Sequence, residues 1–514
     1  MHNYIYNTGT LFYKIAAHYG EKVALSYPDG TTVTFSELES QSNKIAHYFI
    51  AQGLKKGDVV ALFNNKSPLG YCCMLAALKT GIIYTNLDLT SPFERIKKII
   101  DRCMPKLICF DIPADIEDQV KSIGIPSCDL YNTSFRDILH KYSPSLPGST
   151  PQVTGADAAY IMFTSGSTGF PKGAVITHAN LINFISWGQS EFGITDKDIF
   201  TNANPIYFDN SVFDFYISLF SGALLVPLTN TITHDPFSLV AAVAKAGCTV
   251  WFSVPSLLVY LMTTKALSAD SLPSVKRFIF GGEGFPKSKL KKLYDMYHST
   301  AQLFNVYGPT ECTCICSSHL ISNKDFEDMN NLATLGYLAP NFDYVLINSN
   351  GGNFGELCLK GPNVGAGYYN DKERTDKSFI QNPHNSLYNE IVYRSGDLVE
   401  VDSLGHLHFK GRADNQIKHM GYRIELEEIE SLLNTLSYIN EAAVIYERIN
   451  DSMGQIIAFV ATNDIMDDHI VMDDLKAMVP EYMVPRKLYI LEALPKNQNG
   501  KIDKVNLKDF KKTV

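Results

Sequence analysis

The sequence predicts an α/β protein with a large N-terminal domain and a small α+β C-terminal domain. Short β-rich runs such as DVVALF (58–63) and KLICFDI (106–112) alternate with amphipathic segments such as FSELESQSNKIAHYFIAQG (35–53), which is typical of parallel-sheet α/β subdomains. From about residue 340 to 410 the pattern changes to short strands and glycine turns, which favours a β-rich subdomain. A compact α+β pattern follows, so we expect domains at 1–413 and 414–514.

Two further segments define the organisation of the N-terminal domain. The Pro/Ser/Gly-rich stretch SPSLPGSTPQVTG (143–155) is typical of a surface connection before the next strand. The apolar stretch 211–228 contains Asp214 and Pro227, so we expect a buried core segment there and no membrane span.

Composition narrows the class of protein. A chain of 514 residues fits two to four units of about 100–200 residues each. With 45% apolar and 19% charged residues the chain is an ordinary globular one. Its net charge of −9 argues against nucleic-acid binding. The N-terminus lacks the features of a signal peptide, and the 10 cysteines form no CxxC pair, so we expect a cytoplasmic protein with reduced thiols.

The strongest local signal is a strand followed by a loop of small and hydroxyl-bearing residues. YIMF (160–163) is typical of a buried strand, and TSGSTGFPKG (164–173) follows it. Glycines let successive N–H groups converge on an anion, hydroxyl groups donate further bonds, and Lys172 supplies positive charge. The spacing matches neither the P-loop GxxxxGK[ST] nor the dinucleotide turn GxGxxG. We therefore expect a phosphate-binding loop rather than an ordinary Gly/Ser loop.

This loop resembles the signature loop of the adenylate-forming enzymes, which include acyl-CoA synthetases, firefly luciferase and nonribosomal-peptide adenylation domains. The resemblance implies a ligase that uses ATP and Mg²⁺ to convert a carboxylate to an acyl-adenylate, releases pyrophosphate, and transfers the acyl group to a thiol. Further motifs follow in that family's order and cover nearly the whole chain: TFSELE (34–39), LKTGIIYTNLD (78–88), FDNSVFDF (208–215), NVYGPTE (305–311), GELCLKGPNVGAGYYN (355–370), YRSGDL (393–398), GRADNQIKHMGYRIELEEIE (411–430) and LPKNQNGKID (494–503).

The resemblance also implies which residues bind ATP. Thr310 would contact the α-phosphate, and Glu311 would ligate Mg²⁺, for which a hard carboxylate is suited. Tyr307 would stack on adenine, and Asn305 would bind its amino edge. Asp397 would accept both ribose hydroxyl groups. The other expected ATP-binding residues are Thr164, Ser165, Gly166, Ser167, Thr168, Gly169, Lys172, Gly282, Glu283 and Arg412.

Lys501 matches the mobile lysine that reaches the substrate carboxylate and the α-phosphate during adenylation. Asp414 matches the hinge about which the family's mobile C-terminal domain swings between its two half-reactions, so the Gly421–Arg423 region would face the site in the second. Residues 496–514 hold six Lys against two Asp, and this basic tail could instead face an acidic carrier protein.

Asp209 is the most informative residue for the substrate. Amino-acid-activating members of the family have Asp there to pair with the α-ammonium group, and a buried carboxylate needs such a cation. A capping Asp in a loop is the alternative. The other substrate-pocket positions are uncharged, so we expect a small or medium neutral amino acid. By resemblance these positions are Asn210, Phe213, Ser253, Ile279, Gly281, Val306, Cys314 and Ile315.

Three cysteines alternate at 312, 314 and 316, which predicts one face of a strand. Pocket lining is the favoured interpretation, and a CxCxC metal site lacks a fourth ligand at a suitable spacing. The stretches WFSVPSLL (251–258), RFIFGGEGFP (277–286) and LFNVYGPTE (303–311) resemble the D-alanine–carrier-protein ligases. Those ligases have Cys where this chain has Gly281, so we expect Gly281 to enlarge the pocket and admit an amino acid larger than D-alanine.

The sequence therefore predicts a stand-alone amino-acid adenylating ligase. The chain ends 13 residues after Lys501, so the acceptor thiol would come from a separate acyl or peptidyl carrier protein or from coenzyme A. An acyl- or aryl-CoA ligase with the same adenylate chemistry is the alternative, which Asp209 disfavours. A noncatalytic protein on this scaffold would be expected to have lost Glu311, Asp397 or Lys501, all of which are present.

Overall fold

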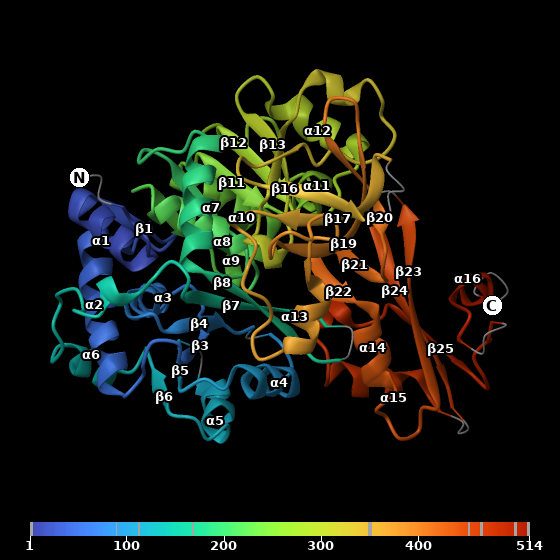
Figure 1. Ribbon diagram of the computed structural model, residues 1–514, viewed down its shortest axis with the longest axis horizontal. Coiled ribbons are helices and arrows are strands. Elements are labelled where there is room, and N and C mark those ends of the chain that lie inside the picture. The colour runs from blue at the N-terminus through green and yellow to red at the C-terminus, as the bar shows by residue number, and fades with distance from the viewer. Residues whose placement is uncertain are drawn as a thin grey trace. The chain divides into compact units, whose positions relative to one another are not determined.

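The computed structural model of the chain divides into two compact units (Figure 1). Unit 1 comprises the N-terminal segment to Leu87 together with 103–163 and 173–411. Unit 2 comprises 88–102, 164–172 and the chain from Arg412 onward. The structure describes residues 4–88, 90–111, 114–166, 169–347, 352–450, 453–462, 466–497 and 501–510.

Two large, mainly parallel sheets form the framework of unit 1, which confirms the predicted fold class. The first has nine strands, of which β9, β10, β11, β12 and β13 pair in parallel and the edges are antiparallel. In sheet order its strands are β15 (Tyr337–Leu338), β14 (Ser317–Leu320), β13 (Gln302–Tyr307), β12 (Arg277–Gly281), β11 (Val250–Ser253), β9 (Ile199–Asn202), β10 (Leu224–Pro227), β1 (Val23–Ser26) and β2 (Thr32–Thr34).

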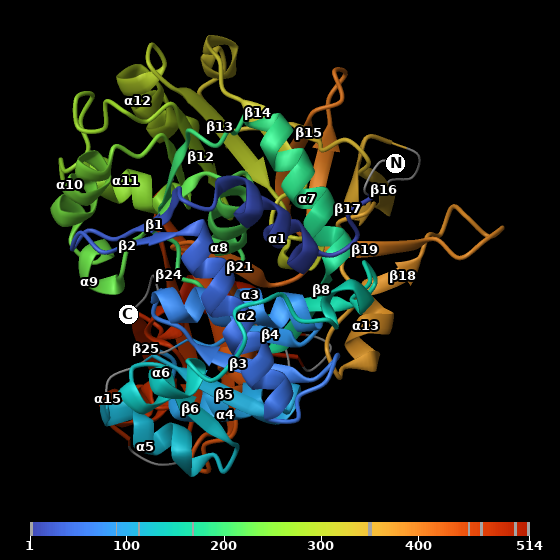
Figure 2. The same cartoon turned by 90° about the vertical axis from the view of Figure 1, so that its left-hand side faces the viewer.

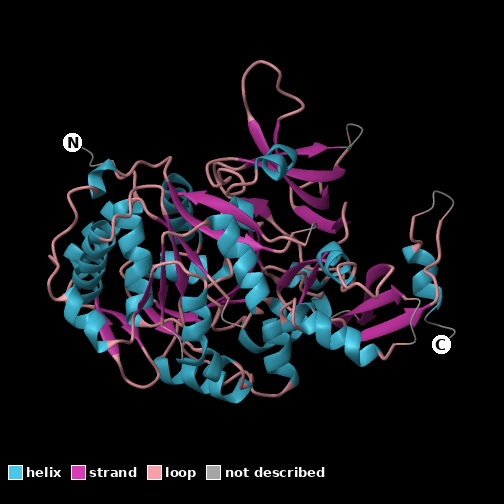
Figure 3. Ribbon diagram, turned by 90° about the horizontal axis from the view of Figure 1, so that it is seen from below, coloured by secondary structure: helices cyan, strands magenta, loops and turns pink. Residues whose placement is uncertain are grey.

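The second sheet has six strands and contains three of the strands that the sequence predicts. DVVALF becomes β3, KLICFDI contains β5, and YIMF lies within β7. Helices lie against the strands of the large sheets in Figure 3, and the burial of β3, β5 and most of β7 explains their continuous apolar character. In sheet order the strands are β6 (Ser127–Asp129), β5 (Leu107–Phe110), β3 (Val59–Phe63), β4 (Ile83–Asn86), β7 (Ala158–Thr164) and β8 (Lys172–Thr177).

Helices cover the sheets of unit 1 and close two hydrophobic cores. The predicted helix at 35–53 forms α2, and a capping box between Thr34 and Glu37 fixes its start. The first core lies between the two sheets and includes residues of α1, α2, α3 and α7. The second core lies on the opposite face of the nine-stranded sheet, under α10, α11 and α12 (Figure 2). The helices involved are α1 (Thr8–Tyr19), α2 (Phe35–Ala51), α3 (Pro68–Thr80) and α7 (His178–Glu191) for the first core, and α10 (Pro236–Ala246), α11 (Pro255–Thr263) and α12 (Lys287–Tyr297) for the second.

The predicted β-rich subdomain is a five-stranded sheet in unit 1. Its strands β16, β17, β19 and β18 pair antiparallel in that order, and β20 pairs with β19. The strands are β16 (Asp343–Ile347), β17 (Phe354–Lys360), β18 (Phe379–Gln381), β19 (Ile391–Val401) and β20 (Leu407–Arg412). The remaining helices of the N-terminal half are α4 (Phe93–Cys103), α5 (Ala114–Ser122), α6 (Thr133–Leu139), α8 (Asn210–Val212), α9 (Asn230–Thr233) and α13 (Lys372–Ser378).

Unit 2 contains a three-stranded sheet with a helical layer on each face. Alternate residues of its two long strands point to opposite faces, so Val444 packs with α14 and α15 whereas Ile445 packs with α16. The two layers lie on opposite sides of the sheet in Figure 1. The elements are β21 (Gln416–His419), β22 (Tyr422–Glu425), α14 (Leu426–Leu433), β23 (Glu441–Asn450), β24 (Met453–Ala461), α15 (Asp468–Lys476), β25 (Lys487–Leu491) and α16 (Lys504–Phe510).

The expectations of no membrane span and of a strand at the alternating cysteines can be compared with the structure. No helix in the described part of the chain combines the length and apolar character needed to cross a membrane. The strand predicted for the alternating cysteines is wrong. A 3₁₀ turn occupies Thr310–Cys312, and Thr313 and Cys314 adopt left-handed backbone conformations. The chain therefore reverses there, and Cys314 enters a different core from Cys312 and Cys316.

His178, the first residue of α7, is fully buried and holds α1 to α7. Its Nδ1 atom accepts the backbone N–H of Thr8 at 3.2 Å and lies 2.7 Å from the Thr8 hydroxyl oxygen. An acceptor at Nδ1 requires the neutral imidazole. Burial lowers the pKa of His178 to about 4.

We expect His178 to make the stability of unit 1 depend on pH. The folded protein binds fewer protons at His178 than the unfolded chain between pH 6.5 and about 4, so the stabilisation is complete above pH 6.5 and declines as the pH falls. The free energy of unfolding falls by about 3 kcal/mol at most through this titration. Urea denaturation at several pH values should show a smaller decline for His178→Gln. The exposed residue His234 supplies the control His234→Gln, and an unchanged pH dependence in His178→Gln would contradict the assignment.

Candidate active site

Within unit 1 the structure brings together the residue predicted to bind the substrate ammonium group and the residue predicted to contact the α-phosphate. Asp209 precedes α8, and Thr310 follows β13. The Thr310 hydroxyl donates a hydrogen bond to Asp209 Oδ2 at 2.6 Å. Residues 101 positions apart thus place a carboxylate and a hydroxyl at one point.

Asp214 fixes the segment that carries Asp209, and the sequence analysis assigned it no role in the site. It lies on a π-helical turn, Phe213–Ile217, and is fully buried. Its Oδ2 accepts the side-chain amides of Asn202 at 3.0 Å and Asn204 at 2.9 Å. Asn204 also donates to the Phe252 carbonyl at 3.0 Å. Asp214 thereby ties the chain leaving β9 to the helix after Asp209. Its position in the FDNSVFDF motif is the sequence feature that could have indicated this role.

Glu311 is fully buried, with a hydroxyl group aligned on its carboxylate. Tyr368 donates its O–H to Glu311 Oε1 at 2.6 Å, and the backbone N–H of Gly365 donates to the Glu311 carbonyl at 2.8 Å. A buried carboxylate oriented by a phenol is a donor of the kind that Mg²⁺ prefers. Tyr368 belongs to the quoted GAGYYN motif, but nothing in the sequence pattern separated it from Tyr369.

The residues predicted for adenine and ribose are also adjacent in unit 1. The Tyr307 hydroxyl donates to Asp397 Oδ2 at 2.6 Å, and burial together with the Asp397 charge raises the pKa of Tyr307 well above its ordinary value. Tyr307 therefore remains a donor that orients Asp397. Asn305 donates its side-chain amide to the Thr334 carbonyl at 2.7 Å. Glu283 accepts the N–H of Ser256 at 2.6 Å, and Gly282 has a φ of +90°.

Most of the predicted substrate-pocket residues lie in one hydrophobic core, and Ser253 is separate from them. Ser253 accepts the indole N–H of Trp251 at 2.8 Å, and Trp251 belongs to the second core. Burial and the nearby Asp209 charge raise the pKa of the Cys314 thiol, which therefore remains neutral. Asn210 lies at the start of α8, where its amide would be 3.7 Å from a Cβ added at Gly282. The buried set is Phe213, Ile279, Val306, Cys314 and Ile315.

Gly281 does not enlarge the pocket as the sequence analysis expected. A Cβ added at Gly281 would lie 2.5 Å from the Val306 carbonyl oxygen and 2.7 Å from its Cγ2. The space that a cysteine side chain would fill is therefore occupied by the neighbouring strand. Gly281 is required by this close approach of β12 and β13, so its presence is no argument for a substrate larger than D-alanine.

The predicted phosphate loop belongs to unit 2, and Ser167 and Thr168 lie outside the described residues. The Ser165 hydroxyl donates to the Arg423 carbonyl at 2.7 Å. The backbone N–H of Gly166 donates to Glu428 Oε2 at 3.1 Å. Lys172 Nζ lies 3.4 Å from Glu425 Oε1. Among the described residues the buried Thr164 hydroxyl has no hydrogen-bond partner. The loop therefore already binds carboxylates with the groups expected to bind phosphate.

An ion pair that the sequence analysis missed stabilises this arrangement in unit 2. Arg95, on α4, pairs with the second oxygen of Glu428, and both side chains are nearly fully buried. Arg95 offsets the charge that Glu428 brings to the loop. Gly169 closes the turn with a φ of +75°, and its carbonyl accepts from Lys98 at 3.3 Å. Arg95 carries no recognisable motif, so only the fold reveals its partner.

The three remaining predicted residues also lie in unit 2. Arg412 and Asp414 form a two-bond ion pair, with Nε–Oδ1 at 2.8 Å and Nη2–Oδ2 at 2.6 Å. Burial alone would raise the pKa of Asp414, but this guanidinium lowers it. Lys501 is exposed, and its backbone N–H donates to Asn497 Oδ1 at 3.1 Å. The Asn497 N–H in turn donates to the Lys501 carbonyl at 2.7 Å.

Comparison with known proteins identifies the class of protein that this fold and site define. Residues 12–369 match the family model described as AMP-binding enzyme, and residues 428–501 match that of the AMP-binding enzyme C-terminal domain. The chain is thus an ATP-dependent, adenylate-forming ligase, which confirms the predicted enzyme class. It belongs to the AMP-binding enzyme family.

Curated relatives match over nearly the whole chain. The chain is 31% identical over 510 residues to a D-alanine--D-alanyl carrier protein ligase of Lacticaseibacillus paracasei, covering 97% of this chain and 98% of the relative. It is 32% identical over 493 residues to the protein of that name from Listeria monocytogenes, covering 93% and 94%. Among solved structures, the Vibrio cholerae adenylation domain AlmE in complex with glycyl-adenosine-5'-phosphate has a TM-score of 0.83 at 23% identity, covering 100% and 99%.

Loss of the Glu428 carboxylate should strongly destabilise unit 2. Glu428→Gln leaves the buried Arg95 guanidinium without its counter-charge, and breaking a buried ion pair costs about 3–5 kcal/mol. Hydrogen–deuterium exchange across α14 should accelerate accordingly. The adjacent Glu427, whose side chain accepts from exposed Asn415, supplies the control Glu427→Gln. Similar exchange in the two variants would contradict a stabilising role for the pair.

Proposed function

We propose that the protein activates a small neutral amino acid with ATP and transfers the aminoacyl group to the phosphopantetheine thiol of a separate carrier protein. The observation that carries this proposal is the contact between Asp209 and Thr310. It joins the residue suited to an α-ammonium group to the residue suited to the α-phosphate. The names of the Lacticaseibacillus and Listeria relatives support both the amino acid and the carrier protein.

The uncharged surroundings of Asp209 support an amino acid with a small neutral side chain. Cys314 stays neutral beside it, and Phe213, Ile279, Val306 and Ile315 supply apolar walls. A charged substrate side chain would lack a counter-ion among them. Gly281 provides no extra room for a larger side chain, because Val306 packs against it, and the names of the relatives point to alanine. D-alanine is therefore a reasonable first substrate.

We assign the remaining ATP contacts as follows. Thr164, Ser165, Gly166 and Lys172 hold the phosphates of ATP, together with Ser167, Thr168 and Gly169 of the same loop. Tyr307, Asn305, Gly282 and Glu283 form the adenine site, and Asp397 and Arg412 bind the ribose. Glu311, oriented by Tyr368, would hold Mg²⁺, which neutralises phosphate charge when bound.

Adenylation requires an in-line attack of the amino-acid carboxylate on the α-phosphorus, with pyrophosphate leaving. Asp209 exchanges the Thr310 hydroxyl for the ammonium end, Thr310 then donates to the α-phosphate, and Lys501 stabilises the charge that develops between carboxylate and phosphate. We further propose that 1–413 and 414–514 act as the two functional domains, with Asp414 as the hinge that removes Lys501 before thiol transfer. We also propose a cytoplasmic location, since the reaction consumes ATP.

The substrate can be identified by ATP–pyrophosphate exchange across a panel of L- and D-amino acids with benzoate and octanoate. We expect strong exchange with one small neutral amino acid. Asp209 is half-buried, and the bound amino acid would cover it. Asp209→Asn should then lower kcat/KM for that amino acid about 30-fold or more, because truncating one partner of a desolvated charge pair costs about 2 kcal/mol or more. The exposed Asp270 supplies the control Asp270→Asn. Exchange with benzoate or octanoate alone would instead indicate the acyl- or aryl-CoA ligase.

Lys501→Ala should lower the rate of adenylate formation by about 100-fold or more while leaving ATP affinity unchanged, since the lysine acts on charge that develops during the reaction. Single-turnover formation of the aminoacyl-adenylate measures the rate, and equilibrium binding of a nonhydrolysable ATP analogue measures the affinity. Lys508 is an exposed lysine of the same basic tail, so Lys508→Ala is the matched control. Equal rates in both variants would reject Lys501 as the catalytic lysine.

A further inference from the structure

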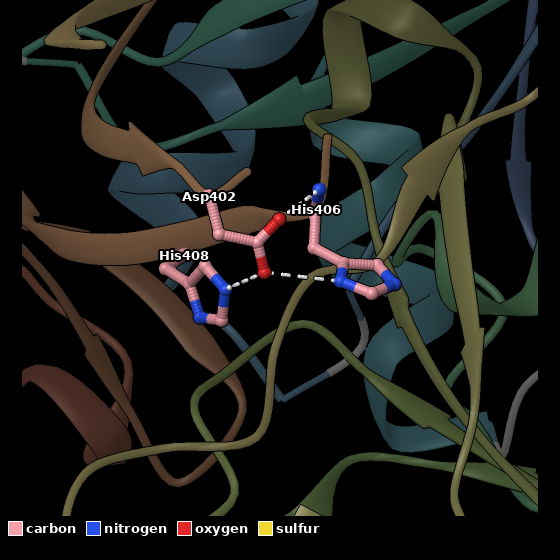
Figure 4. A group of neighbouring side chains, drawn as sticks. All are labelled: Asp402, His406 and His408. Atoms are coloured by element: carbon pink, nitrogen blue, oxygen red, sulfur yellow. Dashed lines mark hydrogen bonds and ion pairs between the residues drawn. The ribbon is translucent and has the colours of Figure 1, made fainter. Parts of the chain in front are cut away.

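A group of metal-ligating side chains lies in the β-rich subdomain, outside the candidate active site. Asp402, His406 and His408 surround the turn between β19 and β20 (Figure 4). Asp402 Oδ2 lies 3.0 Å from His406 Nδ1 and 2.9 Å from His408 Nε2. The three ligand atoms all lie within 4.8 Å of one another. All three residues belong to unit 1, so the geometry is internal to one compact body.

The backbone of the turn holds the carboxylate in place. Asp402 Oδ1 accepts the N–H groups of Leu404 and His406, both at 2.9 Å, and the Asp402 N–H donates to the His406 carbonyl at 3.1 Å. One carboxylate oxygen is therefore committed to the turn, and the other is directed at both imidazoles. A preformed donor of this kind loses little conformational entropy on binding an ion.

The two histidines flank Leu407, the first residue of β20. Leu407, between them, is buried in the core of the subdomain, so His406 and His408 project to the opposite face. The His406 ring packs against Tyr337, with centroids 4.3 Å apart, and edge-on against His319 at 5.5 Å. These contacts fix the orientation of one imidazole, as partners beyond the ligands do in metal sites.

We propose that Asp402, His406 and His408 form a binding site for a divalent transition-metal ion, with zinc as the first candidate. Two imidazoles and one carboxylate are a donor set for zinc and related first-row ions rather than for Mg²⁺ or Ca²⁺. The side chains are 17–37% exposed, so the fourth position faces water and an ion can enter. On binding, each neutral imidazole carries its proton on the other ring nitrogen and gives the lone pair to the metal.

A bound ion would join the end of β19 to the start of β20, the strand pair that carries Asp397. The proposal does not depend on the amino-acid substrate or on the acceptor thiol. A second group, Asp467, Asp468 and His469, has the same kinds of ligand atoms within the same reach, but all three residues are exposed at the start of α15. It therefore serves as an internal comparison.

Zinc binding to the full chain tests the proposal. The protein, free of any polyhistidine tag and treated with a chelator, is titrated with zinc chloride by calorimetry in millimolar Mg²⁺, which occupies carboxylate sites such as Glu311. We expect His408→Gln to weaken the tightest zinc site about tenfold or more, because even indirect partners of a metal ligand contribute that much. His469→Gln should leave that site unchanged.

Cobalt gives an independent readout. Co²⁺ bound by two imidazoles and a carboxylate should produce a ligand-field absorption that His406→Gln and His408→Gln each reduce, and this signal does not depend on enzyme activity. Asp402 also holds the turn, so the histidine variants are the cleaner probes. No high-affinity zinc site in the wild-type chain, equal zinc affinity in His408→Gln, or equal losses in His408→Gln and His469→Gln would each overturn the proposal.

Discussion

The buried carboxylate of Asp214 is the constraint on which the substrate side of unit 1 depends. A carboxyl group with no access to water must be hydrogen-bonded, and here its Oδ2 accepts the amides of Asn202 and Asn204, while burial raises the pKa of Asp214 to about 7. The two amides come from the chain that leaves β9, while the carboxylate comes from the turn after α8. Satisfying this one buried carboxyl oxygen therefore sets the path of the loop between them. That loop presents Asp209 to Thr310, so the geometry of the site follows from the chemistry of the core.

In unit 2, carboxylates of the C-terminal segment contact the glycine-rich loop. Glu428 accepts the Gly166 N–H and is balanced by Arg95, and Glu425 lies beside Lys172. A single N–H group donates one strong hydrogen bond at a time. If this loop binds ATP phosphates as proposed, Glu428 and the nucleotide compete for the same donor. The described state of unit 2 is then one from which the start of α14 must withdraw before the phosphates are bound.

The sequence predicted the fold class and its main elements because their signals are local. Strands β3 and β5 and helix α2 follow from apolar periodicity. The motifs also indicated side chains that the structure brings together across long separations, such as Tyr307 with Asp397. What failed depends on tertiary contact. The alternating cysteines suggested a strand, but left-handed residues at 313 and 314 reverse the chain.

Gly281 shows the same limit, since only the neighbouring strand reveals that Val306 fills the space beside it. Arg95 and Tyr368 were overlooked because an isolated arginine or tyrosine has many possible roles. Their partners, Glu428 and Glu311, are distant in sequence. Motif spacing therefore identified which residues could act, whereas the contacts that orient them required the folded chain.

All ten cysteines of the chain are buried, and burial raises the pKa of several of these thiols, among them Cys248 to about 12. Thiolate is the reactive form, so the native thiols are poor targets for alkylating reagents. A cysteine introduced at an exposed position would be the preferred point of attachment for a fluorophore. One such label in each unit would turn the chain into a distance reporter by energy transfer, without first removing any native residue.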